Sequence, residues 1–177
     1  MIAIRLSYGD KVGFGHLKRM SVLANEFKKR GAFVVFITHS YEVNSENHIN
    51  YISDFVEEQI REEIHDEVNA TLKILNKYPS IRCVIVDDYS LDKSWENKIQ
   101  REGYKVVAFD DILREHCADL VVDGKWRGEN EKCAYRNLIP SDRRVLMVVG
   151  RDFVQWMNSQ FKNGLGKKTN YINLSLS

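Results

Sequence analysis

Short apolar runs alternate along this chain with stretches in which apolar residues recur at helical spacing. Six runs rich in β-branched residues predict strands, at 1–8, 32–38, 81–86, 104–109, 120–123 and 145–149. Between the first two, an amphipathic stripe from Leu17 to Phe27 predicts a helix that Gly31 ends. Further helices are predicted at 92–101 and 152–161. Because a whole helix separates successive strands, the pattern predicts an α/β fold with a mostly parallel sheet.

Two other segments complete the pattern. In 52–78 apolar residues come almost every four positions, which predicts one long amphipathic helix or two abutting ones, with a charged solvent face. The polar segment 39–50 has no clear period and is expected to be irregular. The glycines and lysines of 163–168 are typical of a linker, and 169–177 alternates like a strand. We therefore expect one domain over 1–162, and over 163–177 a linker and the first strand of a second domain.

Composition narrows the possible functions. A formal charge of +1 over 177 residues, without a basic stripe, argues against a nucleic-acid partner. The three cysteines are widely spaced and odd in number, which fits neither a disulfide framework nor a zinc site and favours the reduced cytoplasm. No apolar run approaches the roughly 18 residues that a transmembrane helix needs, so no membrane partner is expected.

The first strand and helix are joined by a glycine turn, Gly13-Phe14-Gly15-His16. Such a turn places free backbone N–H groups and the positive end of a helix dipole at the carboxyl edge of the sheet, where anions bind. His16 lies at that point. The dipole disfavours the imidazolium, so we expect a neutral ring that can accept a proton. The alternative is a histidine that only packs or faces solvent.

Two other predicted strands end in acidic residues, at Asp87-Asp88-Tyr89 and Asp110-Asp111. Parallel strands bring their carboxyl ends to one edge, so these residues are expected near the glycine turn. The alternative is that each aspartate only caps the following helix. A dinucleotide fingerprint is absent, because Lys18 stands where a third glycine is needed. No phosphate-loop lysine is present either, and without a nucleophile elbow covalent acyl transfer has no support. We expect no cofactor and no metal.

Four motifs in order resemble the amino-terminal half of the UDP-sugar hydrolases of pseudaminic acid biosynthesis, over about residues 1–125. They are the Gly13–Arg19 run with Leu23-Ala24, Val86-Asp87-Asp88-Tyr89 with Trp95, Phe109-Asp110-Asp111, and His116-Cys117-Ala118-Asp119-Leu120. These enzymes are built like two-domain GT-B glycosyltransferases. The resemblance implies a Rossmann-like three-layer sandwich as the amino-terminal domain, with a carboxyl-terminal domain or partner chain completing the cleft.

The same resemblance implies the chemistry. Family members release UDP from a UDP-linked diacetamido-trideoxy sugar by attack of water at the anomeric carbon, with inversion. Their general base corresponds to His16, and the tyrosine that helps to hold the water corresponds to Tyr89. We expect substrate to be bound by five further residues: Gly13, Gly15, Arg19, Asp87 and Asp111.

The chain departs from the family at the predicted domain junction. In Gly150–Phe161, Arg151 replaces the family's proline and Phe153 its tyrosine. Two alternatives therefore stay open beside the hydrolase. One is the acceptor-binding half of a GT-B glycosyltransferase, and the other is a truncated module without catalytic activity.

Overall fold

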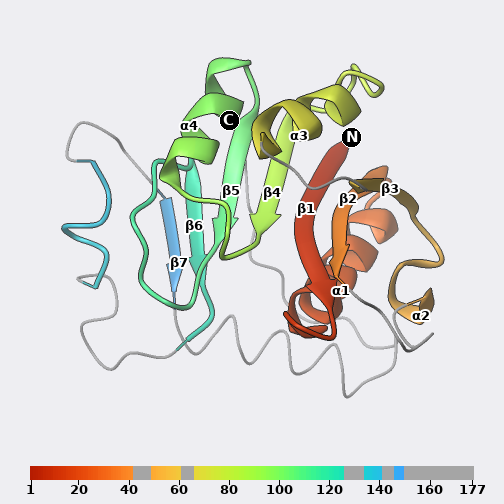
Figure 1. Cartoon of the computed structure of the whole chain (residues 1–177), viewed down its shortest axis with the longest axis horizontal. Helices are drawn as coiled ribbons and strands as arrows, with labels where there is room; N and C mark the ends of the chain where they lie inside the picture. The colour runs from red at the N-terminus through yellow and green to blue at the C-terminus, as the bar shows by residue number, and fades with distance from the viewer. Residues whose placement is uncertain (42–48, 61–65, 126–133, 141–145, 150–177) are drawn as a thin grey trace.

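The computed structural model describes residues 1–41, 49–60, 66–125, 134–140 and 146–149, the last segment as backbone only. Within these residues one sheet has the strands β1 (Ile2–Gly9), β2 (Val34–Tyr41), β3 (Val56–Ile60), β4 (Cys83–Asp87), β5 (Lys105–Phe109), β6 (Leu120–Asp123) and β7 (Leu146–Val149). The helices are α1 (Gly15–Lys29), α2 (Ile49–Ile52), α3 (Glu67–Leu75) and α4 (Lys93–Arg101). Figure 1 shows this arrangement.

Every strand pairs in parallel with its neighbours, in the order β3-β2-β1-β4-β5-β6-β7. The chain builds outward from β1 in one direction and from β4 in the other. In such sheets ligands bind at the carboxyl ends of the two central strands, where the order reverses. The predicted Rossmann-like α/β fold is therefore confirmed, and its crevice lies between the ends of β1 and β4.

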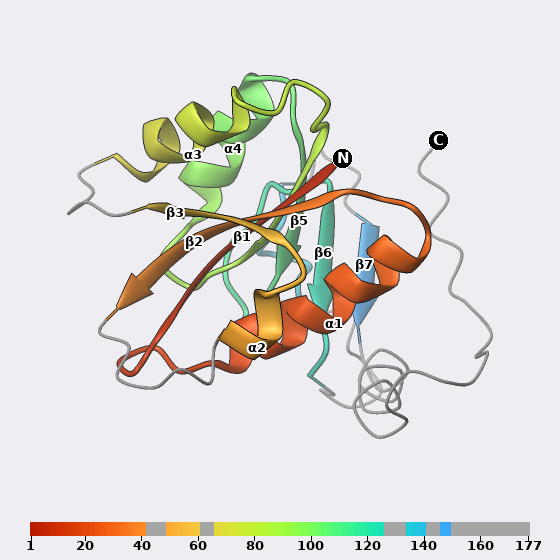
Figure 2. The same ribbon diagram turned by 90° about the vertical axis from the view of Figure 1, so that its right-hand side faces the viewer.

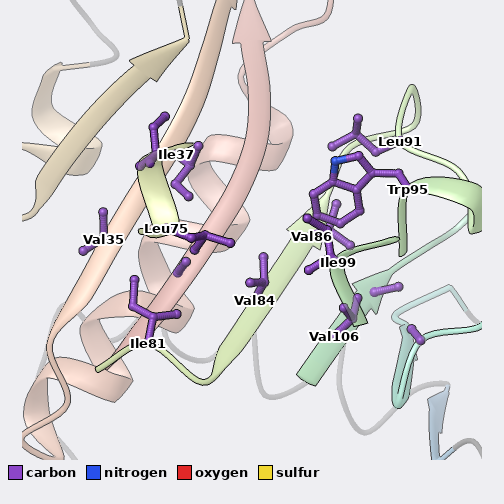
Figure 3. Packing of buried hydrophobic residues seen from close by; sticks show 14 of the residues in the cluster. Val35, Ile37, Leu75, Ile81, Val84, Val86, Leu91, Trp95, Ile99 and Val106 are labelled. Carbon is purple, nitrogen blue, oxygen red and sulfur yellow. The ribbon is translucent and has the colours of Figure 1, made fainter. Parts of the chain in front are cut away.

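Helices cover both faces of the sheet, which gives three layers. Figure 2 shows α1 and α2 on one face, with α3 and α4 on the other. Under α1 and α2 the strands bury residues such as Ile4, Leu6 and Phe36. Under α3 and α4 they bury the cluster drawn in Figure 3, which includes Val84 and Trp95. Central strands buried on both faces explain the continuous apolar runs in the sequence.

The helix predicted over 52–78 is wrong in its first half. Val56–Ile60 is the edge strand β3, paired with β2 from Val35↔Val56 to His39↔Ile60. The true helix, α3, starts only at Glu67, where the Asp66 side chain accepts a hydrogen bond from Asn69 N–H. Apolar residues four positions apart, such as Val56 and Ile60, share a face in a strand as well as in a helix. The spacing therefore could not distinguish the two structures.

The other predicted elements agree closely where the structure describes them. Gly31 follows α1 with a φ of +78°, the left-handed conformation typical of a glycine just past a helix. The segment predicted to be irregular, 39–50, instead contains the end of β2 and the start of α2. The predicted helix at 152–161, the predicted linker and the final strand lie outside the described residues, as does the boundary at 162/163.

Candidate functional site

The glycine turn joins β1 to α1 at the carboxyl edge of the sheet. Gly9 ends β1 with a φ of +139°, and a Cβ there would lie 1.8 Å from the carbonyl oxygen of Tyr41, so this position requires glycine. Gly13, with a φ of +82°, donates its N–H to the Gly9 carbonyl at 2.7 Å and closes the turn. Helix α1 then begins at Gly15, and no side chain caps its amino terminus. The turn thereby places His16 in the first turn of α1.

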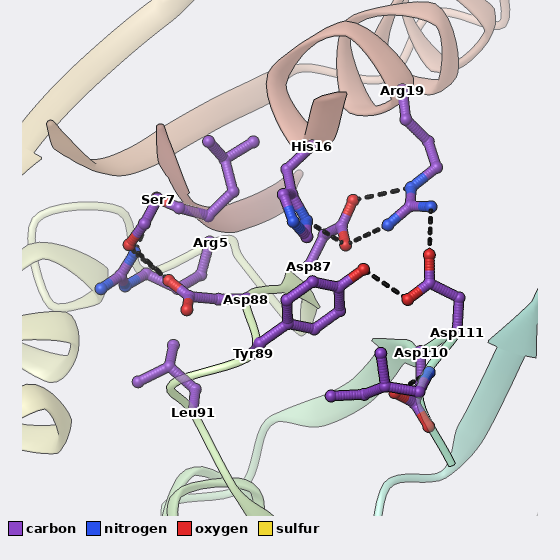
Figure 4. A network of polar contacts seen from close by, with 12 residues as sticks. Arg5, Ser7, His16, Arg19, Asp87, Asp88, Tyr89, Leu91, Asp110 and Asp111 are labelled. Carbon is purple, nitrogen blue, oxygen red and sulfur yellow. Dashed lines mark hydrogen bonds and ion pairs between the residues drawn. The ribbon is translucent and has the colours of Figure 1, made fainter. Parts of the chain in front are cut away.

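His16 forms a pair with Asp87, the last residue of β4. The His16 Nδ1 lies 2.7 Å from Asp87 Oδ1, and the Asp87 side chain is fully buried (Figure 4). In the neutral ring, a carboxylate at this distance holds the proton on Nδ1 and leaves Nε2 as an acceptor. The pair therefore has the geometry of a general base that is oriented by a carboxylate.

Asp87 also accepts two hydrogen bonds from the Arg19 guanidinium. Arg19 Nε donates to Asp87 Oδ2 at 2.9 Å, and Arg19 Nη2 donates to Oδ1 at 2.6 Å. Burial opposes ionisation of this carboxyl, but the hydrogen bonds from His16 and Arg19 outweigh it and lower the pKa of Asp87. His16 and Arg19 are three positions apart on one helix face, so both reach the same carboxylate.

The pKa of His16 lies above its ordinary value of 6.5, which contradicts the expectation drawn from the helix dipole. Burial disfavours the imidazolium, but the hydrogen bond and the negative charge of Asp87 favour it more strongly. The partial charge of a helix terminus is weaker than a full carboxylate charge at hydrogen-bond distance. His16 is thus a stronger base than the sequence alone indicated.

Tyr89, two residues beyond Asp87, contacts both Asp111 and His16 and so joins these residues into one set of contacts. Its hydroxyl donates to Asp111, whose Oδ2 lies 3.7 Å from Arg19 Nη1. Its ring meets the His16 ring edge-on, with centroids 4.7 Å apart. Burial and the Asp111 hydrogen bond raise the pKa of Tyr89 to about 12, so the phenol keeps its proton near neutral pH. The Tyr89 oxygen can then act toward a ligand as an acceptor.

A cavity of about 350 Å³ opens beside this set of contacts. It is lined by Ser7, Val12, His16, Tyr41, Asp88, Tyr89 and Ser90. The volume falls in the range of small-molecule sites. The cavity combines aromatic rings with hydroxyl and carboxylate groups, which can contact the faces and hydroxyls of a polar ring-shaped ligand.

Asp88 is held on the cavity wall from both sides. Its Oδ1 accepts from Ser90 N–H at 2.9 Å and from Ser90 Oγ at 2.7 Å. Its Oδ2 accepts from Ser7 Oγ and lies 3.4 Å from Nη1 of Arg5. Arg5 is fully buried and also pairs with Glu67 at 2.8 Å, which ties β1 to the start of α3. Asp88 is consequently a rigid part of the wall.

The seven residues singled out from the sequence come together at one edge of the sheet. His16 and Tyr89 line the cavity, while Arg19, Asp87 and Asp111 lie behind them and contact one another. Gly13 and Gly15 form the turn beside them. Asp87 is not a helix cap, because Asp92 caps α4 by accepting from Ser94 and Trp95 N–H.

Asp88, which was expected near the glycine turn, lines the cavity, whereas sequence reasoning missed Ser7, Val12, Tyr41 and Ser90. Ser7 stands near the end of β1, so the strand-end rule could have found it. Tyr41 was hidden because 39–50 was expected to be irregular. Within the described residues no group of three or more His, Cys, Asp or Glu side chains is arranged to hold a metal ion. None of the described helices has the length and apolar character to cross a bilayer.

No protein-family model matches this chain. Over 123 residues it is 28% identical to the UDP-2,4-diacetamido-2,4,6-trideoxy-beta-L-altropyranose hydrolase of Campylobacter jejuni. The chain resembles that hydrolase. The match covers 69% of this chain and 40% of the relative, so the chain spans less than half of the relative's length.

Among solved structures, MurG of Acinetobacter baumannii aligns with a TM-score of 0.47 and 14% identity, over 81% of this chain and 44% of that one. The hydrolase match confirms the resemblance predicted from the four motifs.

Proposed function

We propose that this chain is the base-bearing half of a UDP-sugar hydrolase, which releases UDP and free sugar from a UDP-linked diacetamido-trideoxy sugar. The observation that carries the proposal is the His16–Asp87 pair, which opens into a cavity beside Tyr89. The similarity to the Campylobacter jejuni hydrolase supports the choice of substrate class.

The proposed reaction begins with a water molecule between His16 and Tyr89. Nε2 of the neutral His16 ring accepts one hydrogen of the water, and the Tyr89 oxygen accepts the other, because the Tyr89 proton is donated to Asp111. A lone pair of the water oxygen is then free to attack the anomeric carbon. A base held in this way contributes about a hundredfold to ten-thousandfold to the rate.

The proposed reaction is a single displacement at the anomeric carbon. As the water oxygen bonds to the anomeric carbon, the bond from that carbon to the diphosphate oxygen breaks on the opposite side, which inverts the configuration. The water proton passes to His16 Nε2, and Asp87 stabilises the imidazolium that forms. UDP leaves as a stable anion, so the proposal needs no general acid.

The diphosphate belongs, in this proposal, near the amino terminus of α1. Uncapped N–H groups at a helix start attract phosphate, and no side chain caps α1. A Cβ on Gly15 would meet no atom within 4 Å beyond its chain neighbours and the backbone of its own helix, so space is open there for a ligand. We place the chain as the amino-terminal domain of a GT-B-type protein, in which a second domain or partner chain binds the nucleotide.

The test is UDP release from the UDP-diacetamido-trideoxy-altrose by the complete protein that contains this chain. We expect His16→Ala to lower kcat by about a hundredfold or more, because the water loses its base. Lys28→Ala, an exposed change at the other end of α1, is the control and should retain activity. Turnover by His16→Ala equal to that of the unchanged protein would remove His16 from the mechanism.

Two outcomes would favour the alternatives. Sugar transfer to an acceptor, with no free sugar formed without one, would favour a GT-B glycosyltransferase whose acceptor occupies the same cavity. No heat in calorimetry with either UDP or the UDP-sugar would favour a module without catalytic activity.

A further inference from the structure

Beyond β5 the chain makes a tight turn that presents Arg114. Asp110 builds this turn, because its carboxylate accepts N–H groups of Ile112 at 3.2 Å and of Arg114 at 2.9 Å. Leu113, within the turn, has a φ of +61°. The left-handed region is disfavoured for a residue with a side chain. Strained residues of this kind persist where the surrounding structure demands them, often beside functional sites.

The side chain of Arg114 crosses from this turn to the loop between β4 and α4. Its Nη1 donates to the carbonyl oxygen of Leu91 at 2.9 Å, and lies 3.2 Å from that of Tyr89 and 3.3 Å from that of Asp88. Its Nε donates to Asp110 at 3.3 Å, which fixes the other side of the guanidinium. Arg114 therefore ties three successive parts of the loop to the turn after β5.

The same guanidinium lies over the Tyr89 ring, with Cζ 5.7 Å from the ring centroid. Tyr89 is 41% exposed, so packing alone does not immobilise it. Its position is set by Asp111 at the hydroxyl, by His16 at the ring edge and by Arg114 over the ring and at the backbone (Figure 4 shows the first two). Among these contacts, those of Arg114 alone hold both the ring and the main chain.

We propose that Arg114 is a positioning residue of the site: it holds the β4–α4 loop so that Tyr89 keeps its place against His16 and Asp88 keeps its place on the cavity wall. Arg114 is absent from the cavity lining, so it acts through the loop. The effect of Arg114 on catalysis rests on the proposed function, whereas its effect on the position of the Tyr89 ring does not.

The chain offers a matched control in Arg82. Its Nη1 also donates to backbone carbonyls, those of Pro79 and Ile81, but directly before β4, at the opposite edge of the sheet. Substituting Arg82 removes the same kind of contact far from the cavity. A general effect of losing an arginine that binds carbonyls would therefore appear in both variants.

The first experiment records the NMR signals of the His16 ring protons in this chain. The Tyr89 ring current shifts these protons, because the rings are in edge-to-face contact. We expect Arg114→Met to move the His16 signals most of the way to their positions in Tyr89→Leu. Arg82→Met should leave them unchanged. Unshifted His16 signals in folded Arg114→Met would overturn the proposal.

A second variant guards against loss of the fold. Arg114→Lys keeps a positive charge beside Asp110, but an ammonium is one donor centre and lacks the planar fork whose Nη1 contacts the loop while Nε contacts Asp110. We expect its His16 signals to move in the same direction as those of Arg114→Met. Unshifted signals in folded Arg114→Lys would also contradict the proposal.

Kinetics of the complete protein provide a separate readout. A misplacement of about 1 Å in a site can lower a rate about a hundredfold, so we expect kcat of Arg114→Met to fall by about tenfold to a hundredfold. The midpoint of its pH–rate profile should stay the same, because the His16–Asp87 pair is untouched. An unchanged kcat with shifted His16 signals would overturn the catalytic part alone. Absence of hydrolysis in the unchanged protein would overturn the proposed function and leave the NMR test valid.

Discussion

At His16 two influences act in opposite directions on one proton. Burial and the start of α1 favour the neutral ring, whereas Asp87 favours the imidazolium. The carboxylate prevails because it lies at hydrogen-bond distance and is itself kept ionised by Arg19. The three residues therefore act as one unit, in which Arg19 supports the carboxylate that sets the basicity of His16.

This arrangement predicts the effect of Asp87→Asn on the pKa of His16. The asparagine oxygen can still accept from Nδ1–H but carries no charge. Burial and the positive charge of Arg19 then oppose the imidazolium, with only the weaker effect of Asp88 favouring it, so the pKa of His16 should fall below 6.5. An NMR titration of His16 measures it. Since a base acts when deprotonated, hydrolysis should rise with pH through a midpoint above 6.5 in the unchanged protein. The midpoint should be lower in Asp87→Asn.

The control for this prediction is Asp111→Asn. Asp111 contacts Arg19 and Tyr89, whereas the shift at His16 is caused mainly by burial and Asp87, so the amide should change the pKa of His16 far less than Asp87→Asn does. Equal pKa values of His16 in the unchanged protein and in Asp87→Asn would show that the carboxylate does not control the base.

Among the elements, β3 shows most clearly how packing overrides a local pattern. The segment is rich in charge, yet Glu57 is drawn into the sheet because its Oε1 accepts from Thr38 Oγ1 at 2.6 Å and from the Tyr8 hydroxyl at 3.1 Å. Both donors belong to fully buried residues, in β2 and β1. An acceptor that reaches two buried hydroxyls favours the strand over the solvent-exposed helix that the spacing suggested.

Removing that acceptor should destabilise the protein. Glu57→Ala leaves the Thr38 and Tyr8 hydroxyls without their shared partner, and we expect the free energy of unfolding in urea to fall by about 1–3 kcal/mol. Glu58→Ala, which breaks contacts with Lys77 and Tyr78 nearer the surface, should lower it by less than about 1 kcal/mol. Equal losses in the two variants would argue against this role for Glu57.

Apart from α2, the sequence predicted the other described elements because their patterns are unambiguous. The Leu17–Phe27 stripe matches only the helical period, and continuous runs such as the one around Val84 match buried parallel strands. The helix at 92–101 is confirmed with Asp92 as its N-cap. Where the spacing of apolar residues fits both the helical and the strand period, as at Val56 and Ile60, only pairing with β2 decides that the segment is a strand.

At the scale of the whole molecule, a buried ionic cluster around His116 joins α4 to the end of β5, away from the His16–Asp87 pair. His116, 1% exposed, has Nδ1 2.6 Å from Glu96 in α4 and Nε2 3.2 Å from Asp110 after β5. Glu96 also accepts from the N–H groups of Cys117 and Ala118, and the Tyr135 hydroxyl reaches Asp110. Asp110 thus belongs both to this cluster and to the turn that presents Arg114.

This cluster predicts a pH dependence of stability. Burial opposes the imidazolium, but Asp110 and Glu96 outweigh it and raise the pKa of His116 from 6.5 to about 9. The contribution of His116 is therefore complete below about pH 6.5. It is lost as the pH rises through about 9, because the unfolded chain releases the proton first. Its size is on the order of 3 kcal/mol.

The measurement is urea unfolding between pH 6 and pH 9. We expect His116→Gln to lose about 3 kcal/mol at pH 6 and to show a flatter pH dependence than the unchanged protein. His39→Gln, a change outside the cluster, should keep the dependence. A slope that persists unchanged in His116→Gln would assign the pH dependence to other groups.

The sequence by itself determined the α/β alternation, the glycine turn before His16 and the presence of Asp87, Tyr89 and Asp111 at strand ends. These features are local, because each depends on the period of burial or on the residues beside a turn. Only the tertiary structure decided that His16 pairs with Asp87, 71 positions away, and that Arg114 reaches the carbonyl of Asp88, 26 positions away. Such pairs form because β1, β4 and β5 lie side by side in the sheet. That adjacency sets the charge around His16, which no local pattern encodes.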